Sequence, residues 1–299
     1  MMKLKANLMI ASLSAVLLAG CGQDKDTTPT TAETTATSAI ELSDAAVENL
    51  VKRSWQFVAM YNVNNKGAML YKGWNLCDVD TKLKDHTLKL IARPNNDSLY
   101  ISCPIDLRKE PVILDMPAFD SKYVSLMVTG YDHYVNIPMS TRQGDFKKPE
   151  KMLFFSERTA GYKKGEQVEG VDRYFEASGD FLSAVFRVMP HANEAERFDR
   201  IKDQMQSVKL LTLSQLRGDK AKPTDGVEFP PVGKTDLDVF ENNLLEVMQF
   251  VFNHTSFDPD NALDQKLLAL YKPLGVVPGQ AYDPERVAKL DGKRLRQVA

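Results

Sequence analysis

The chain has 299 residues, of which 43% are hydrophobic and 26% charged, and its formal net charge is −2. This composition is ordinary for a soluble globular protein, and the length allows one large domain or two small ones with a substantial core. No basic run is longer than a pair of residues. Together with the near-neutral charge, this argues against nucleic acid or an acidic polymer as a partner.

Residues 1–20 predict a lipoprotein signal peptide. Lys3 and Lys5 provide a positive start, and residues 8–18 form an uncharged apolar run. That run is shorter than the roughly 20 residues that span a bilayer. Leu18-Ala19-Gly20-Cys21 then looks like a bacterial lipobox, in which the cysteine carries acyl chains such as palmitate and becomes the mature N-terminus. A plain signal peptide with a chance cysteine is the alternative.

Cys21 is therefore the predicted lipidation site and the contact with the membrane. Because several acyl chains anchor a protein stably, we expect an anchored protein and not a spanning one. Gly22 follows the cysteine. By resemblance to sorted lipoproteins, which carry aspartate there when the inner membrane retains them, this favours the outer membrane, with the protein facing the periplasm.

A disordered tether is predicted over residues 21–39, because they contain no aromatic residue and no aliphatic residue larger than alanine. Residues 40–299 are expected to form a single domain. It begins with a helix that has Ser43 as its N-cap, ends at Asn62, Asn64, Asn65 and Gly67, and packs on a sheet.

Short apolar runs separated by turn residues predict strands in the middle of the chain. The expected strands are His86–Ala92, Leu99–Ile105, Val112–Met116, Tyr123–Thr129, Tyr134–Pro138, Met152–Ser156 and Phe181–Met189. Such spacing is typical of an antiparallel sheet, sandwich or barrel.

The last third of the chain predicts helices. We expect one over Asn193–Leu216, one opened by the capping box Thr235-Asp236-Leu237-Asp238, a shorter one over Ala262–Leu270 and a basic one from about Pro284. The fold class expected is therefore α+β, with an antiparallel β-sandwich or sheet core flanked by N-terminal and C-terminal helices.

Five stretches stand out as motifs: Arg93-Pro94-Asn95-Asn96-Asp97-Ser98-Leu99-Tyr100, Asp106-Leu107, Pro111-Val112-Ile113-Leu114, Tyr131-Asp132-His133-Tyr134-Val135-Asn136 and Leu274-Gly275-Val276-Val277-Pro278-Gly279. Together they resemble one bacterial family of domains of unknown function, the one numbered twelve-fifty-four. The resemblance covers about Ala45 to Tyr282. Many relatives carry a second, mostly β domain after the last stretch, and we expect that domain to be absent here. The family name implies no reaction.

The first stretch is the predicted site. Asn95, Asn96 and Asp97 favour a tight turn, and they are either a structural turn or the polar wall of a pocket. Our hypothesis is that the turn forms a ligand pocket together with residues of two neighbouring stretches. The binding residues would be Arg93, Asn95, Asn96, Asp97, Tyr100, Tyr131, Asp132, His133 and Arg187, with either Arg93 or Arg187 as a partner for Asp132.

Acid–base chemistry would require Asp132 or His133 to face that pocket; the alternative is a satisfied core or surface role. No metal or cofactor is expected. The four histidines are far apart in the sequence, and neither a nucleophile elbow nor a phosphate-binding glycine loop occurs. These histidines are His86, His133, His191 and His254.

Cys77 and Cys103 are the cysteines that remain after Cys21. In an oxidising periplasm they form either a disulfide or two buried thiols.

Three functions therefore stay open. The protein binds a small or lipidic ligand near the Arg93–Tyr100 turn, or it is a periplasmic enzyme using Asp132 or His133 as acid or base, or it is an envelope assembly module acting through its C-terminal helices. The ligand, the catalytic residues and the oligomeric state are not predicted.

Overall fold

A computed structural model describes residues 41–87 and 95–299, which lie within one compact unit. Its β part consists of two sheets. The first has five antiparallel strands in the order β1 (Asp78–Asp80), β2 (Leu99–Asp106), β8 (Phe181–Val188), β4 (Val124–Thr129) and β5 (Val135–Ser140). The second has the order β7 (Arg173–Glu176), β6 (Glu150–Phe155), β3 (Val112–Met116) and β9 (Lys209–Thr212), with only β7 parallel to its neighbour.

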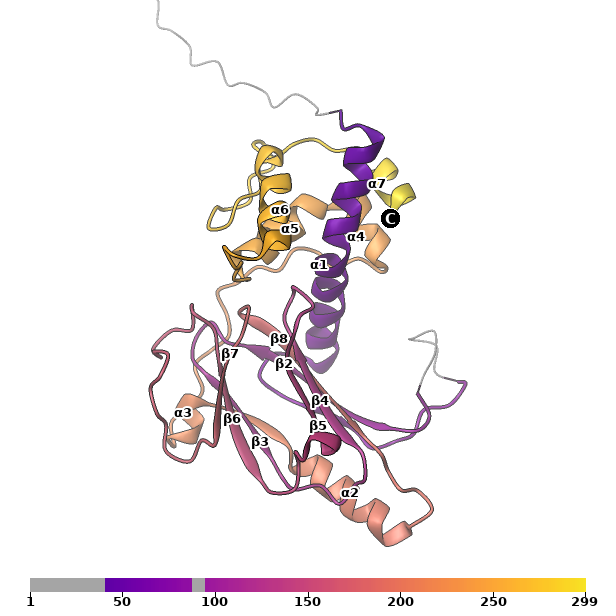
Figure 1. The fold of residues 1–299 in the computed structure, drawn as a ribbon, viewed down its shortest axis with the longest axis vertical. Helices are drawn as coiled ribbons and strands as arrows, with labels where there is room; N and C mark the ends of the chain where they lie inside the picture. The colour runs from indigo at the N-terminus through magenta and orange to yellow at the C-terminus, as the bar shows by residue number, and fades with distance from the viewer. Residues whose placement is uncertain (1–40, 88–94) are drawn as a thin grey trace, which may run out of the picture. The chain divides into compact units, whose positions relative to one another are not determined.

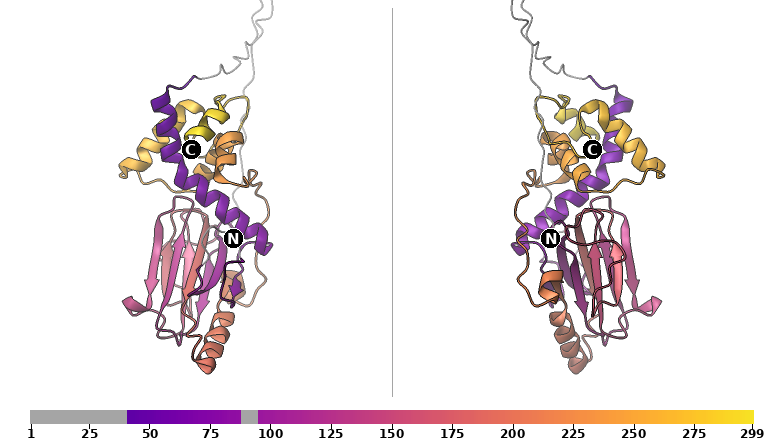
Figure 2. Two further views of the ribbon diagram at one scale, coloured as in Figure 1. Left: turned by 90° about the vertical axis from the view of Figure 1, so that its right-hand side faces the viewer. Right: turned by 90° about the vertical axis from the view of Figure 1, so that its left-hand side faces the viewer.

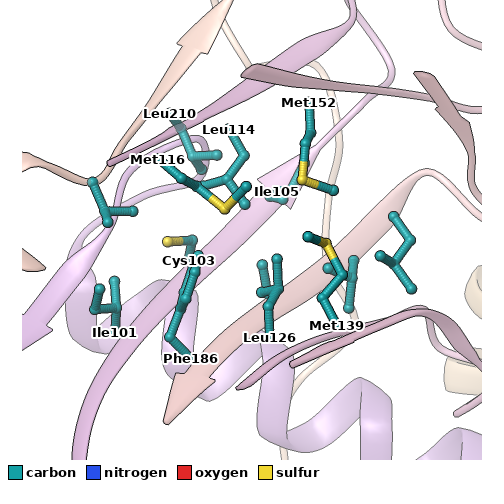
Figure 3. Close-up of a cluster of buried hydrophobic side chains, with 14 of the residues drawn as sticks. Ile101, Cys103, Ile105, Leu114, Met116, Leu126, Met139, Met152, Phe186 and Leu210 are labelled. Carbon is teal, nitrogen blue, oxygen red and sulfur yellow. The ribbon is translucent and has the colours of Figure 1, made fainter. Parts of the chain in front are cut away.

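The two sheets enclose an apolar core, because alternate residues of each strand point to the same side. In β2, Leu99, Ile101, Cys103 and Ile105 are fully buried while Tyr100 and Ser102 are only half-buried. These inward side chains pack against those of the second sheet, such as Leu114, Met116 and Met152 (Figure 3). The arrangement confirms the predicted α+β class with a sandwich core.

A disulfide joins Cys77 to Cys103, with an S–S distance of 2.03 Å. It ties the segment that precedes β1 to the middle of β2. Asn75 reinforces the same link, because its side chain accepts from the Asp106 N–H at 2.8 Å and donates to the Asp106 carbonyl at 3.0 Å.

The helices form a second core. α1 (Asp44–Tyr71) packs mainly against α4 (Asp236–Asn242), α5 (Leu244–Asn253), α6 (Ala262–Tyr271) and α7 (Gly292–Val298). Figures 1 and 2 show these helices beside the N-terminal half of α1, with the sheets at its other end. The expectation that α1 packs on a sheet is therefore wrong for most of its length. Two further helices, α2 (Ala195–Ser207) and α3 (Leu213–Leu216), belong to the β part.

α1 begins as predicted, with the Ser43 hydroxyl accepting from the Ala46 N–H at 3.3 Å. It does not end at the predicted asparagines, but continues to Tyr71. Buried partners explain the difference: the Asn65 amide donates to the Tyr61 carbonyl and the Tyr131 hydroxyl, and the Asn62 amide donates to Asp236. Tertiary contacts thus override the weak helix propensity of asparagine.

Two other helices differ from the prediction. The expected helix over Asn193–Leu216 stops at Ser207, because the next residues pair with β3 as β9. The last helix begins at Gly292, where Asp291 caps it by accepting from the Arg294 N–H. The expected strand His86–Ala92 falls mostly outside the described residues. The predicted capping box at Thr235 is present, with the Asp238 carboxylate accepting from the Thr235 N–H at 2.8 Å.

Among the described residues, no helix combines the length and apolar character needed to cross a bilayer.

The disulfide yields a stability prediction. Its removal in Cys77→Ala is expected to lower the free energy of unfolding by about 3 kcal/mol, because the unfolded chain gains the freedom of an open loop. Urea denaturation of the oxidised wild type and the variant measures this. In Cys77→Ala the buried Cys103 keeps an unpaired thiol, and the double variant Cys77→Ala/Cys103→Ala shows whether that thiol itself affects stability. Equal stability of wild type with and without reductant would contradict the prediction.

Candidate functional site

The predicted site does not come together in one place. Asn95, Asn96 and Asp97 form an exposed turn in which the Asp97 N–H donates to the Asn95 side chain at 2.7 Å. This is the local hydrogen bonding of a structural turn. Arg93 lies outside the described residues, so its role stays a prediction.

Tyr100 and Arg187 are cross-strand neighbours on the outer face of the first sheet. The Arg187 guanidinium carbon lies 6.0 Å from the centre of the Tyr100 ring, a cation–π distance. Arg187 therefore contacts Tyr100 and not Asp132, which corrects the expected pairing.

Strand order explains why the two motifs are apart. β2 and β4 both pair antiparallel with β8, so they run in the same direction. The turn at Asn95–Asp97 precedes β2, whereas Tyr131–Tyr134 follows β4. The eight residues of β2 separate these ends by about 25 Å at about 3.3 Å per residue. One pocket cannot contain both.

Tyr131, Asp132 and His133 form a turn and not a strand. Asp132 is only 3% exposed, and its carboxylate accepts from the Tyr134 N–H at 3.1 Å. Burial raises its pKa, and the neighbouring Asp264 carboxylate adds to the effect. His133 is exposed, with a φ of 63°, so it does not face a shared cavity with Asp132.

The structure instead places an apolar hollow of about 370 Å³ where α1 meets the loop before α4. We call it the Trp74 hollow. Its walls are the C-terminal end of α1, the segment at Trp74 and the loop at Phe229–Val232. The lining residues are Asn65, Ala68, Met69, Lys72, Gly73, Trp74, Phe229, Pro230, Pro231 and Val232.

Aromatic rings support this hollow. Trp74 stacks on Phe229 with ring centres 5.7 Å apart and lies 4.9 Å from the buried Phe181. Phe250 of α5 contacts both Phe181 and Phe229. Phe181 belongs to β8, yet it is part of the helical core, so the β part and the helices meet beneath the hollow.

Hydrogen bonds fix the walls. The Tyr61 hydroxyl donates to the Pro230 carbonyl at 2.6 Å, and the Asn243 amide donates to the Pro231 carbonyl at 2.9 Å. Asn75 and the disulfide hold the Trp74 segment from the other side. The hollow is therefore bounded by anchored segments.

The buried Asp180 carboxylate also joins the β part to the helices. Asp180 accepts from Arg158 Nε at 3.1 Å and from Ser156 Oγ at 2.8 Å, and it lies 2.9 Å from His254 Nδ1. Despite the burial, which acts in the opposite direction, the His254 hydrogen bond and the Arg158 charge hold the pKa of Asp180 below its ordinary value. This carboxylate links the loop after β6, the start of β8 and the end of α5.

Sequence reasoning missed the hollow as a site. Its loop comes from a segment more than 150 positions after Trp74. The available signal was Phe229-Pro230-Pro231-Val232, an apolar run inside an otherwise polar loop.

The buried Asp132 predicts a pH effect on stability. Its folded pKa is raised, so between about pH 4 and that raised value the unfolded chain ionises while the folded protein holds the proton, and wild type loses stability as the pH rises. Asp132→Asn keeps an oxygen that can accept from Tyr134 but does not ionise. The variant should therefore gain stability relative to wild type across this window.

Urea titrations at several pH values test this, with Asp97→Asn at the exposed turn as the control for lost charge. A difference between Asp132→Asn and wild type that is constant from pH 3 to pH 7 would contradict the assignment.

One known crystal structure agrees with the fold. The VPA0106 protein of Vibrio parahaemolyticus, whose crystal structure is known, matches with a TM-score of 0.58 at 21% identity, over 84% of this chain and 56% of that one. The chain thus spans about half of that protein. An uncharacterized protein from Burkholderia cenocepacia gives a TM-score of 0.29 at 13% identity, over 77% of this chain and 59% of that one.

No curated protein matches the chain. The model of the family described as "Protein of unknown function (DUF1254)" matches residues 76–209, which include β1 to β8. The resemblance stated from the motifs is confirmed for the four stretches within residues 76–209, which match the model of that family.

Proposed function

We propose that the protein is a lipid-anchored envelope protein that binds a small apolar or lipidic molecule in the Trp74 hollow. The observation that carries the proposal is the hollow itself. Its volume of about 370 Å³ lies at the lower end of the range for small-molecule sites, which are mostly apolar with a few polar groups.

The chemistry of the walls supports an apolar ligand. Trp74, Phe229 and the two prolines offer flat surfaces without hydrogen-bonding groups in their side chains other than the indole N–H. Asn65 is already bonded to Tyr61 and Tyr131. Lys72 is the one cationic side chain in the lining, and it is exposed. A ligand with an apolar body therefore fits these walls.

Preorganisation supports binding as well. Because the Pro230 carbonyl is held by Tyr61 and the Trp74 segment by the disulfide, a ligand would order few groups when it enters. Less ordering means less lost entropy and tighter binding.

Binding is favoured over the two other functions inferred from the sequence. The Asp132 carboxylate already accepts a hydrogen bond from the Tyr134 N–H inside its turn, and His133 lies apart from it on the surface. An assembly role through the C-terminal helices has less support, because their apolar faces pack around α1 in the helical core.

Two adjacent residues give a matched binding test. Met69 lines the hollow, Leu70 does not, and both are 68% exposed, so neither is needed for folding. Met69→Asp places a charge at the mouth of the hollow, and the Kd for the uncharged fluorescent probe N-phenyl-naphthylamine should rise about tenfold or more. Leu70→Asp should bind as wild type does. Equal effects of the two substitutions, or no binding by wild type, would refute the proposed site.

The anchor is tested separately on the full chain in a bacterial host. Acylation at Cys21 adds a mass to the mature protein that Cys21→Ser should lack, and the variant should move from the outer-membrane fraction to a soluble or unprocessed form. Mass spectrometry and membrane fractionation measure this. An outer-membrane protein without acyl chains would overturn the proposed anchor and leave the ligand site unaffected.

A further inference from the structure

A second hollow, of about 420 Å³, lies between α1 and α6. We call it the α1–α6 groove. None of its lining residues belongs to the Trp74 hollow. Lys52, Arg53, Gln56 and Phe57 line it from α1, at the spacing that places side chains on one side of a helix.

The groove has an apolar floor. Phe57 of α1 and Leu267 of α6 are each only 3% exposed, and both belong to the helical core. Leu263, one turn before Leu267, is largely exposed at the rim. The apolar surface open to a ligand is therefore mainly that of Leu263 at the rim, above a nearly closed floor.

Two cations lie over this floor. Arg53 Nε donates to the Asn49 side chain at 2.9 Å. The ion pair that the structure shows on α1 joins Asp44, the first residue of the helix, to Arg294 and involves neither Lys52 nor Arg53. Within residues 41–87 and 95–299, no carboxylate lies within ion-pair distance of Lys52 or Arg53. Their charges are therefore available to an anion.

Asp264 is the acidic residue in the lining, and its carboxylate is already used. It accepts from the Asp258 N–H at 3.0 Å, and the Tyr134 hydroxyl lies 3.4 Å away. The side chain is buried, so its charge is directed at these donors and not at the mouth of the groove. The exposed charge of the groove is therefore positive.

From this combination we infer that the α1–α6 groove binds a small anionic amphiphile, a carboxylate or phosphate on an apolar body. The anion would lie at Lys52 and Arg53, and the body would lie against Leu263, above the floor of Phe57 and Leu267. A forked guanidinium beside an ammonium suits either anion. This is a second site with a ligand class different from that of the Trp74 hollow.

The test uses dodecanoate as the probe and isothermal titration on the folded domain. The double variant Lys52→Ala/Arg53→Ala is expected to raise the Kd about tenfold or more, whereas alanine at these exposed and half-buried helix positions leaves the fold intact. The matched control is Arg142→Ala/Lys163→Ala, which removes the same charges from exposed positions elsewhere. Repeating the titration in a Met69→Asp background removes any contribution from the Trp74 hollow.

Two further probes distinguish the contribution of the ligand's anionic group from that of its alkyl chain. Dodecyltrimethylammonium should bind at least about tenfold more weakly than dodecanoate, and inorganic phosphate alone should bind weakly because it covers no apolar surface. Binding to phosphatidylglycerol vesicles but not to monomeric dodecanoate would show that the anionic amphiphile bound by the groove is a membrane lipid. Unchanged dodecanoate binding in Lys52→Ala/Arg53→Ala, or equal affinity for the cationic amphiphile, would overturn the inference.

Discussion

The structure depends on the contact that the start of β8 makes with the helices. Phe181 opens β8, but its ring is buried among Trp74, Phe229 and Phe250 of the helical side. The residue before it, Asp180, is bonded through its side chain to His254 at the end of α5 and through its N–H to the His254 carbonyl. An apolar contact and a buried charge thus hold the same two residues of the strand against the helices.

This joint determines where a ligand site can form. Two separate cores meet there, one between the sheets and one around α1. At their boundary the chain passes through two anchored segments, the turn at Trp74 and the loop at Phe229–Val232, which touch where the Trp74 ring stacks on Phe229. Close packing is expected inside each core, whereas the hollow lies at the boundary, where hydrogen bonds of Tyr61 and Asn75 hold the segments that form its walls.

Much of the fold was predictable from local patterns. Alternating apolar residues predicted β3 with its observed bounds and β2, β4 and β8 to within a residue at each end. Cap chemistry located the starts of α1 and α4 at Ser43 and Thr235. The predictions failed where tertiary contacts decide: buried partners keep Asn62 and Asn65 in a helix, and pairing with β3 makes a strand of Lys209–Thr212.

The site was far less predictable. Tyr131 and Asp132 were expected beside the turn at Asn95 because both stretches carry polar motifs next to strands. Their true separation follows from β8 inserting between β2 and β4, and nothing in the order of the strands along the chain reveals that insertion. The Trp74 hollow required two segments distant in sequence to meet, and the local pattern of each one predicts only a turn or a loop.

Quenching of Trp74 by an apolar ligand tests the central claim most directly. The chain has two tryptophans, Trp55 and Trp74, so Trp55→Phe leaves Trp74 as the single reporter. A bromine-tipped dodecanol bound in the hollow should quench Trp74 emission in a saturable way, and the reciprocal variant Trp74→Phe should show no saturable quenching of Trp55. Equal quenching of the two tryptophans, or none of Trp74, would contradict the account.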